Sequence, residues 1–339
     1  MIIRIIPMPY GDCIILQWDS VSGDKRTVML DSGTQAAYCK YIRGLLSQLN
    51  YDIDLWVISH FHSDHIGGVL KYIDDLNGGI INTRCRRWMF NFIDIEGSSI
   101  LCDQASIAES VKQGSKLSLF LNGLGFTSKD CAVASGMTYV LDDVKFTFLS
   151  PMHKHNLCDV IENDQASFAA ASTTDYLQTI DSFNVDAFDE DVNAVNSGSI
   201  SVLVEFAEKK LLWLSDSHPG DICSSLKELG YSKSNPLICD YMTLPHHGSK
   251  GNTSTELLEL VRCERYIVTA DGDNIYNLPN KETLVKTIKY NRSISESHIE
   301  FLFPSLSNTP CGIFAVDGKS VYEEYDFSIK TGVTVLTLD

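Results

Sequence analysis

The sequence predicts a mixed α/β protein in which short strands and helices alternate along the chain. Short apolar runs bounded by turn residues recur throughout, and longer segments between them place apolar residues at helical spacing. The pattern of the first part then returns in the second part. At 339 residues, with 44% hydrophobic and 21% charged residues, the chain can bury a substantial core as one large unit or as two fused halves.

The expected elements follow in chain order. In the first part we expect strands at residues 1–8, Cys13–Trp18, Thr27–Asp31 and Leu55–Ser59, helices near Ala36–Leu49, Ile66–Leu76 and 105–124, and a strand pair at Gly136–Pro151. In the second part we expect strands at Ser199–Phe206, Lys210–Ser215, one that runs into Leu244 and one at Tyr266–Ala270, with helices at Asp221–Leu229 and Ser254–Val261.

We interpret residues 1–339 as one domain, with halves of about 1–151 and 197–339 and an acidic insertion of about 155–196 between them. The chain has no Lys or Arg from His155 to Glu208, whereas acidic residues are frequent there. Such a segment is typical of a mobile lid, of a solvated surface excursion without a role, or of a contact for a protein partner. The sequence leaves these alternatives open.

Composition excludes some classes of function. A net charge of −17 and a pI near 4.8 disfavour long nucleic acids and anionic membranes as partners. The basic run Arg84, Arg86 and Arg87 is more typical of a solvated face. No apolar run approaches the roughly 20 residues that span a bilayer, and the ten cysteines are scattered without a Cys-x-x-Cys pair. We therefore expect a soluble cytoplasmic protein with reduced thiols.

The segment Ser59–Gly68 carries four residues of metal-ligand type, His60, His62, Asp64 and His65. We expect the two leading histidines at a strand end, where their imidazoles project to the same side and can hold one borderline ion such as zinc. The aspartate and the last histidine follow in the turn into a helix and can reach a neighbouring ion. A surface histidine cluster with Asp64 as a helix cap is the alternative, but this density of ligands favours a metal site.

A site for two ions needs ligands from elsewhere, and two later strand ends offer them. The apolar strand in Leu211–His218 runs to Asp216, whose two oxygens can bridge two cations. The second place is Leu244–Gly251, which carries the adjacent His246 and His247. Strand-end aspartates are also common turn residues, and paired histidines occur in surface loops. The preceding motif makes the metal interpretation the favoured one for both.

These motifs resemble those of the metallo-β-lactamase-fold hydrolases, and within them the soluble domain of ComEC-type competence proteins and its stand-alone relatives. The resemblance covers nearly the whole chain, and order and spacing agree. The matching segments are Met8–Ile15, Val28–Gly33, His60–His65, Asn196–Leu203, Leu212–Asp216 and Pro245–Ser249.

The resemblance implies a four-layer αββα sandwich with two divalent ions in the cleft between two facing sheets. Zinc is the expected metal and manganese the alternative. The resemblance also implies that His60 and His62 bind the first ion, that Asp64 and His65 bind the second, and that Asp216 bridges the two.

The remaining roles that it implies concern residues around these ligands. One of His246 and His247 completes the second site, with His247 favoured. Asp31 accepts hydrogen bonds that fix the ligand loop. At the place where many family members have a third histidine for the first ion, this chain has Asn196, which predicts a weaker first site. Ser215 stands where the branch has glycine. The candidate substitutes for the missing ligand are His153, His155 and His218.

The implied chemistry is hydrolysis by a metal-activated water, with Asp64 or Asp216 taking up the proton. We expect His246, as the spare histidine, to act as a general acid or to bind the transferred oxygen. Ser249 and Lys250 are candidates for holding an anionic group of the substrate, although ordinary loop chemistry explains them equally well.

Three functions remain in competition. The favoured one is a phosphodiesterase that acts on a nucleotide, a phosphorylated small molecule or a single-stranded nucleic acid. The second is a hydrolase of a lactone, thioester or β-lactam, which the same water can attack. The third is a metal-holding interaction protein without turnover, whose acidic insertion serves a protein partner.

Overall fold

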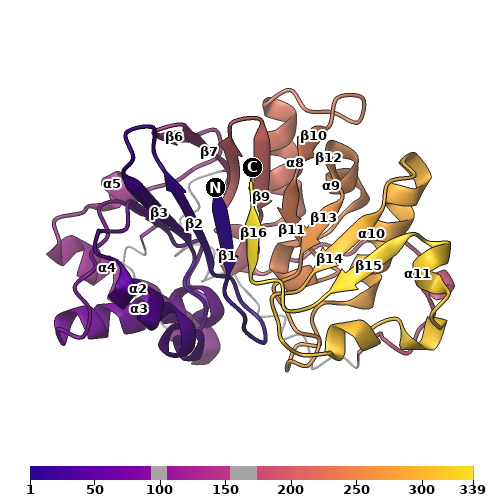
Figure 1. The fold of residues 1–339 in the computed structure, drawn as a ribbon, viewed down its shortest axis with the longest axis horizontal. Helices are drawn as coiled ribbons and strands as arrows, with labels where there is room; N and C mark the ends of the chain where they lie inside the picture. Colours follow the sequence, from indigo (N-terminus) through magenta and orange to yellow (C-terminus); the bar gives the residue numbers. More distant parts are fainter. Residues whose placement is uncertain (93–104, 153–173, 339) are drawn as a thin grey trace.

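The computed structural model describes residues 1–92, 105–152 and 174–338 of the chain. Two mixed sheets face each other, and helices cover the outer side of each, so the layers follow in the order helix, sheet, sheet, helix (Figure 1). The predicted four-layer α/β architecture is confirmed.

The first sheet has the strand order β16-β1-β2-β3-β4-β5. Its strands are β1 (Ile2–Ile5), β2 (Ile14–Asp19), β3 (Lys25–Leu30), β4 (Leu55–Val57), β5 (Trp88–Met89) and β16 (Val335–Thr337). β3, β4 and β5 run parallel to one another, whereas the other neighbours are antiparallel. The last strand of the chain therefore pairs with the first, and the two termini lie side by side (Figure 1).

The second sheet has the order β15-β14-β13-β11-β9-β8-β7-β6. Its strands are β6 (Thr138–Leu141), β7 (Val144–Ser150), β8 (Ser201–Phe206), β9 (Lys209–Trp213), β11 (Tyr241–Thr243), β13 (Arg265–Ile267), β14 (Ile299–Leu302) and β15 (Phe327–Lys330). The strands from β9 to β15 are parallel. A small parallel pair, β10 (Leu237–Cys239) with β12 (Val261–Cys263), lies apart from this sheet.

Helices on the first sheet are α1 (Gln35–Ala37), the π-helix η1 (Tyr38–Ile42), α2 (Arg43–Gln48), α3 (Ser63–Asn77), α4 (Ala105–Gly123) and α5 (Ser128–Cys131). Those on the second sheet are α8 (Pro219–Glu228), α9 (Thr255–Leu260), α10 (Lys281–Ile294) and α11 (Val321–Glu324). The connecting turns are η2 (Ile180–Ser182), α7 (Ala194–Ser197), η3 (Pro245–Gly248), η4 (Thr309–Gly312) and η5 (Ala315–Asp317). Among the described helices, none is long and apolar enough to cross a membrane.

Side-chain alternation along the strands explains the layers. Within β4, Leu55 and Val57 pack between the two sheets, whereas Trp56 packs under the helices of the first sheet. In β9, Leu211 faces the first sheet and Leu212 faces the outer helices. Because successive residues of a strand point to opposite faces, apolar residues at every position bury both faces of a sheet.

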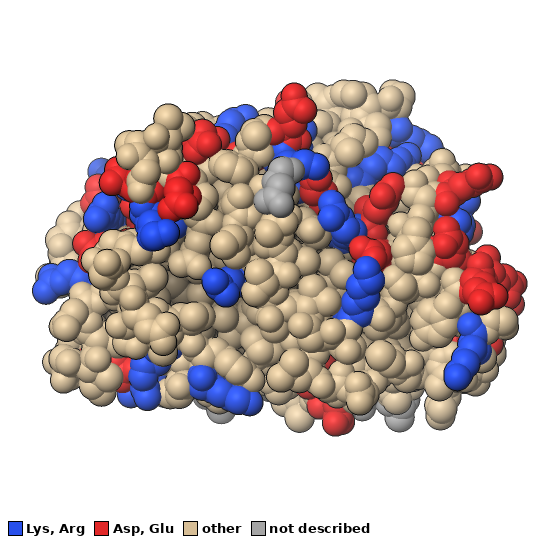
Figure 2. Space-filling view, viewed as in Figure 1, with Lys and Arg blue, Asp and Glu red and all other residues tan. Residues whose placement is uncertain are grey.

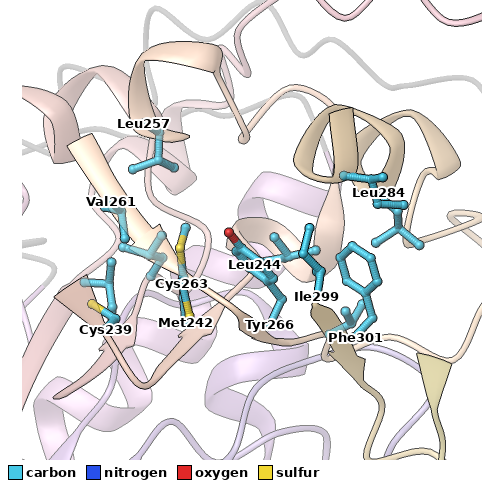
Figure 3. Close-up of a cluster of buried hydrophobic side chains, with 14 of the residues drawn as sticks. Cys239, Met242, Leu244, Leu257, Val261, Cys263, Tyr266, Leu284, Ile299 and Phe301 are labelled. Atoms are coloured by element: carbon cyan, nitrogen blue, oxygen red, sulfur yellow. The ribbon is translucent and has the colours of Figure 1, made fainter. Parts of the chain in front are cut away.

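The outer core of the second sheet shows how the helices attach. Leu257 of α9 and Leu284 of α10 point towards Met242, Tyr266 and the other labelled side chains of the sheet (Figure 3). On the molecular face shown in Figure 2, Lys and Arg side chains lie interspersed with Asp and Glu around a largely uncharged centre.

Several predicted boundaries were wrong by two or three residues, and two of these errors concern the site. β4 ends at Val57 and β9 at Trp213, so the residues that follow each strand are loop residues. The predicted helix at Ala36–Leu49 is interrupted by the π-helix η1. Val261, expected at a helix end, begins β12. Such ends depend on tertiary contacts that local propensity does not record.

Helix α3 is held against the loop after β3 by a contact that only glycine permits. A Cβ on Gly68 would stand 2.1 Å from the backbone oxygen of Ser32. The Ser32 hydroxyl donates to the His65 carbonyl and accepts from the Val69 amide, at 2.6 and 2.9 Å. The glycine therefore sets the distance between the start of α3 and the first sheet.

We expect Gly68→Ala to destabilise the protein by about 1–3 kcal/mol, because the added methyl group forces α3 away from Ser32. Gly44→Ala is the matched control, since Gly44 lies exposed in α2 and a methyl group added there would meet no atom within 4 Å. It should raise stability by roughly 0.5–1 kcal/mol. Urea unfolding of both variants measures the difference, and equal effects would contradict the proposed contact.

Candidate metal centre

The ligand-type residues follow the carboxyl ends of strands in both sheets, at the edge where these sheets face each other. The loop after β4 carries His60 and His62, and the first turn of α3 carries Asp64 and His65. The loop after β9 carries Asp216, and the turn η3 after β11 carries His246 and His247. The sequence predicted that His60 and His62 lie at the end of a strand. In the structure β4 ends at Val57, so the loop between β4 and α3 places these two histidines together.

One tight group contains Asp64, His65 and His247. The Nε2 atoms of His65 and His247 are 3.2 Å apart, and Asp64 Oδ2 lies 3.5 and 3.1 Å from them. Asp216 Oδ1 lies 3.3 Å from His65 Nε2 and 3.5 Å from His247 Nε2. These four side chains surround one point with two imidazoles and two carboxylates.

The other oxygen of Asp216 faces different imidazoles. Asp216 Oδ2 lies 3.7 Å from His60 Nε2 and 3.4 Å from His246 Nε2. His62 Nδ1 is 3.0 Å from His60 Nε2. The structure therefore brings together all six residues predicted as metal ligands, and it adds His246 on the side of His60 and His62.

The donor set fits divalent ions. Asp216 Oδ1 is buried and has no hydrogen-bond partner among the described residues, although two imidazole nitrogens lie within 3.5 Å of it. Imidazole nitrogens and carboxylate oxygens that converge on one point in this way are the arrangement that bonds of about 2.0–2.2 Å to a common ion require.

Asp31 holds the ligand loop from behind, at the place that the sequence predicted for it. Its carboxylate accepts from the Ser59 amide and the Ser59 hydroxyl, both at 2.7 Å, and lies 2.6 Å from His65 Nδ1. Because the Nδ1 atom of His65 is occupied in this way, its Nε2 atom faces Asp64 and Asp216.

Two functional carboxylates were missed in the sequence. Asp12 accepts from Trp213 Nε1 at 2.8 Å, and its other oxygen lies 3.4 Å from His247 Nδ1. Asp191 Oδ2 lies 3.2 Å from His246 Nδ1 and accepts from Asn196 Nδ2 at 2.8 Å. The matching segment Met8–Ile15 contains the first and was a signal for it, whereas the second stands unmarked in an acidic run.

The end of the acidic insertion thus reaches the site. Asn196, predicted near the first ion, lies with its Nδ2 3.4 Å from His246 Nδ1. His218 Nε2 lies 4.0 Å from Asp191 Oδ2. His153 and His155 lie outside the described residues.

Ser249 and Lys250 have other partners in the structure. The Ser249 hydroxyl accepts from the Gly251 amide within its own turn. The exposed Lys250 ammonium lies 3.9 Å from Glu282. The described contacts of these two residues are therefore those of a loop.

Four residues of the site adopt left-handed backbone conformations, which side chains other than glycine rarely take. The φ angles are 57° at Asp31, 45° at Ser215, 49° at His246 and 56° at His247. Each costs about 1–3 kcal/mol, and the surrounding structure must supply that energy.

The histidines of the site are of two kinds, those whose pKa is lowered and those whose pKa is raised. Burial, with His65 and His62 nearby, lowers the pKa of His60 well below its usual range. Burial also lowers the pKa of His62. For His247, burial opposes protonation, but Asp216, Asp12 and Asp64 raise its pKa to about 10.

His65 and His246 behave like His247. Burial opposes their protonation, but Asp216 and neighbouring carboxylates raise the pKa of His65 well above its usual range and that of His246 to about 9. The pKa of Asp216 falls well below its usual value, since His246, His65 and His247 outweigh the effect of burial. Without a bound ion, protons on these imidazoles balance the buried carboxylates.

Comparison with known proteins agrees with this site. A family model described as the Metallo-beta-lactamase superfamily matches residues 10–81, the part of the chain that contains His60–His65. That superfamily consists mostly of metal-dependent hydrolases, so the match supports such an enzyme. No curated protein matches the chain.

Solved structures with a similar course of the chain include Zn²⁺-bound PqqB from Methylobacterium extorquens, at 11% identity and a TM-score of 0.45, with all of both chains covered. A diphosphatase of the PhnP family has 12% identity and a TM-score of 0.37, with 98% of this chain and 87% of that one covered. A putative zinc-dependent hydrolase from Thermotoga maritima has 10% identity and a TM-score of 0.35, with 89% of each covered.

We expect metal binding to release protons, because His247 has a pKa of about 10 and is protonated at neutral pH before it can act as a ligand. The apparent affinity should rise roughly tenfold per pH unit for each displaced proton until the pH passes that pKa. Titration calorimetry of zinc into the metal-free protein, in two buffers of different ionisation enthalpy, counts these protons. A pH-independent affinity would contradict the electrostatic balance described above.

We expect Asp31→Asn to weaken metal binding by roughly 10- to 100-fold, because His65 loses the carboxylate that orients it. Asp54→Asn is the control, since Asp54 is also buried in the first sheet and accepts from the Thr27 amide at 2.9 Å, but contacts no ligand among the described residues. Chelator competition measures both affinities. Equal losses in the two variants would show a general effect of stability.

Proposed function

We propose that the chain is a metal-dependent phosphodiesterase that acts on a nucleotide, a phosphorylated small molecule or a single-stranded nucleic acid. We further propose that it is a stand-alone relative of the soluble domain of ComEC-type proteins, on the motifs Pro245–Ser249 and Asn196–Leu203. Two cations on either side of a phosphodiester can stabilise both the attacking and the leaving oxygen, and the arrangement of ligand-type residues around Asp216 is suited to holding two.

The observation that carries this proposal is the orientation of Asp216. Its two oxygens face separate imidazole pairs, His65 with His247 and His60 with His246, at 3.3–3.7 Å. One buried carboxylate that faces two donor groups is suited to bridging two cations, and a site for a single ion does not need it.

Bound divalent ions would supply a water of lowered pKa and charge stabilisation for the attacked group. The residues of the chain would hold these ions and move a proton. Asp64 is the better placed of the two carboxylates for the proton, since 14% of its side chain is exposed against 2% for Asp216. Its Oδ2 is the oxygen that faces His65 and His247.

A pair of aromatic side chains next to His247 supports a nucleotide-like substrate. The Tyr10 ring lies 6.5 Å from the His247 ring and 5.0 Å from that of Tyr276, which is 53% exposed. An exposed aromatic edge next to the site is suited to a base or a sugar. The net charge of −17 favours a small or single-stranded substrate over a long duplex.

The test combines metal analysis with a panel of substrates for the metal-loaded protein. Bis-p-nitrophenyl phosphate, a cyclic dinucleotide and single-stranded DNA represent phosphodiesters; a lactone, a thioester and a β-lactam represent the alternative. We expect turnover of a phosphodiester and a loss of at least about 100-fold in Asp216→Asn, because the site for developing charge is lost. Asp240→Asn is the control, since Asp240 pairs with Lys209 away from the site.

The other outcomes choose between the remaining functions. A preference for the carboxylic substrates would replace the phosphodiesterase with the alternative hydrolase. Full metal content without turnover of any substrate would favour a metal-holding interaction protein, and a protein without metal would overturn the proposal altogether.

A further inference from the structure

We infer that His246 is the third imidazole ligand of the first ion, and that Asp191 positions it. This inference rests on the proposed two-ion site and deepens it. It replaces the general-acid role that the sequence suggested for His246, and it supplies the ligand that the asparagine at position 196 cannot provide.

The distances place His246 with the donors of the first ion. His246 Nε2 lies 3.4 Å from Asp216 Oδ2, and His60 Nε2 lies 3.7 Å from the same oxygen. These distances are close to the separation of two ligand atoms that each lie about 2.0–2.1 Å from a tetrahedral ion. The oxygen that faces His246 is not the one that faces His65 and His247, so the two adjacent histidines serve different ions.

The backbone explains how neighbours in sequence reach different ions. Both His246 and His247 lie in the left-handed region, with φ angles of 49° and 56°. This turn sends the His247 side chain inwards, where 2% of it is exposed, and keeps His246 nearer the surface at 26%. The His246 amide donates to the Ser215 carbonyl at 2.7 Å, which ties the turn to the loop that carries Asp216.

The carboxylate behind His246 is an independent observation. His65 and His247 each have a carboxylate near Nδ1, Asp31 and Asp12 respectively. His246 repeats this arrangement, since Asp191 Oδ2 lies 3.2 Å from its Nδ1. Ligand histidines characteristically donate their second N–H to such a group, which fixes the ring and leaves the other nitrogen for the metal.

Amide groups complete this support. Asn252 Oδ1 lies 3.0 Å from His246 Nδ1, while Asn252 Nδ2 donates to Asp191 Oδ2 at 3.2 Å. Asn196 also donates to Asp191. Asn196 therefore does not bind the ion itself. It holds the carboxylate of Asp191, which orients the ligand His246.

The donors define the ion that each site prefers. The first site would have three imidazoles and one carboxylate oxygen, whereas the second has two imidazoles and two carboxylates. Nitrogen-rich tetrahedral sites suit zinc, and oxygen donors also suit manganese. The first site should therefore be the more selective for zinc.

The test measures bound metal and does not depend on turnover. We expect the wild-type protein to hold two zinc ions per chain after dialysis against limiting chelator, and His246→Gln to hold one. His60→Gln should also hold one, and the double variant His60→Gln/His246→Gln should still hold one, because both changes remove the same ion. Combining His246→Gln with His247→Gln should remove both ions.

Cobalt substitution gives a second readout. The absorption bands of tetrahedral Co²⁺ should lose the same component in His246→Gln as in His60→Gln, and a different component in His247→Gln. Asp191→Asn leaves the ligand in place and tests its positioning if His246→Gln does not fold. It should weaken binding of the first ion by roughly 10- to 100-fold. His218→Ala is its control, since His218 lies next to Asp191 without facing Asp216.

Three results would overturn the inference. One is two tightly held ions in His246→Gln, another is loss of the ion that His247 binds, and the third is an unchanged affinity in Asp191→Asn. Each leaves the proposed phosphodiesterase standing, whereas a wild-type protein without metal overturns both proposals.

Discussion

The buried carboxylate of Asp216 is the constraint around which the structure is organised. Only about 2% of its side chain is exposed, and an isolated charge in such a place costs several kcal/mol. Four imidazoles from segments that follow strands of both sheets face its two oxygens. The sandwich satisfies this requirement because β4 in one sheet, and β9 and β11 in the other, end at the same edge, so their loops meet.

Residues that are not themselves metal ligands keep this edge of the sheets rigid. Asp31 fixes Ser59 and His65, while glycine at position 68 allows α3 to approach the loop after β3. Left-handed residues at Asp31, Ser215, His246 and His247 concentrate strain in the same place. Strain of this kind persists only where the surrounding packing over-determines the backbone. The two cores that flank the sheets therefore support the geometry of the site as well as the stability of the fold.

The sequence predicted the parts of the site that are local and left out the parts that depend on topology. His60–His65 is visible because four residues of ligand type stand within six positions, and Asp216 and His247 follow apolar strands that can be recognised. Asp191 has no such signal, since its neighbours are acidic and the side chains of Asn196 and Asn252, which donate to it, lie 5 and 61 positions away. The pairing of β16 with β1 was equally invisible, because three exposed or half-buried residues carry no distinct period. Long-range pairing leaves little trace in a local pattern.

The charges around the site give a separate reason to expect two ions. Five carboxylates converge there, Asp12, Asp31, Asp64, Asp191 and Asp216, and their ion pairs within the described parts of the chain are with histidines. Imidazoles that act as ligands are neutral, so they cannot balance this charge. One divalent ion would leave three negative charges buried together, whereas two would leave one. The proposed second ion would therefore add to the balance of charge beside Asp216, to which the carboxylates next to His65, His246 and His247 also belong.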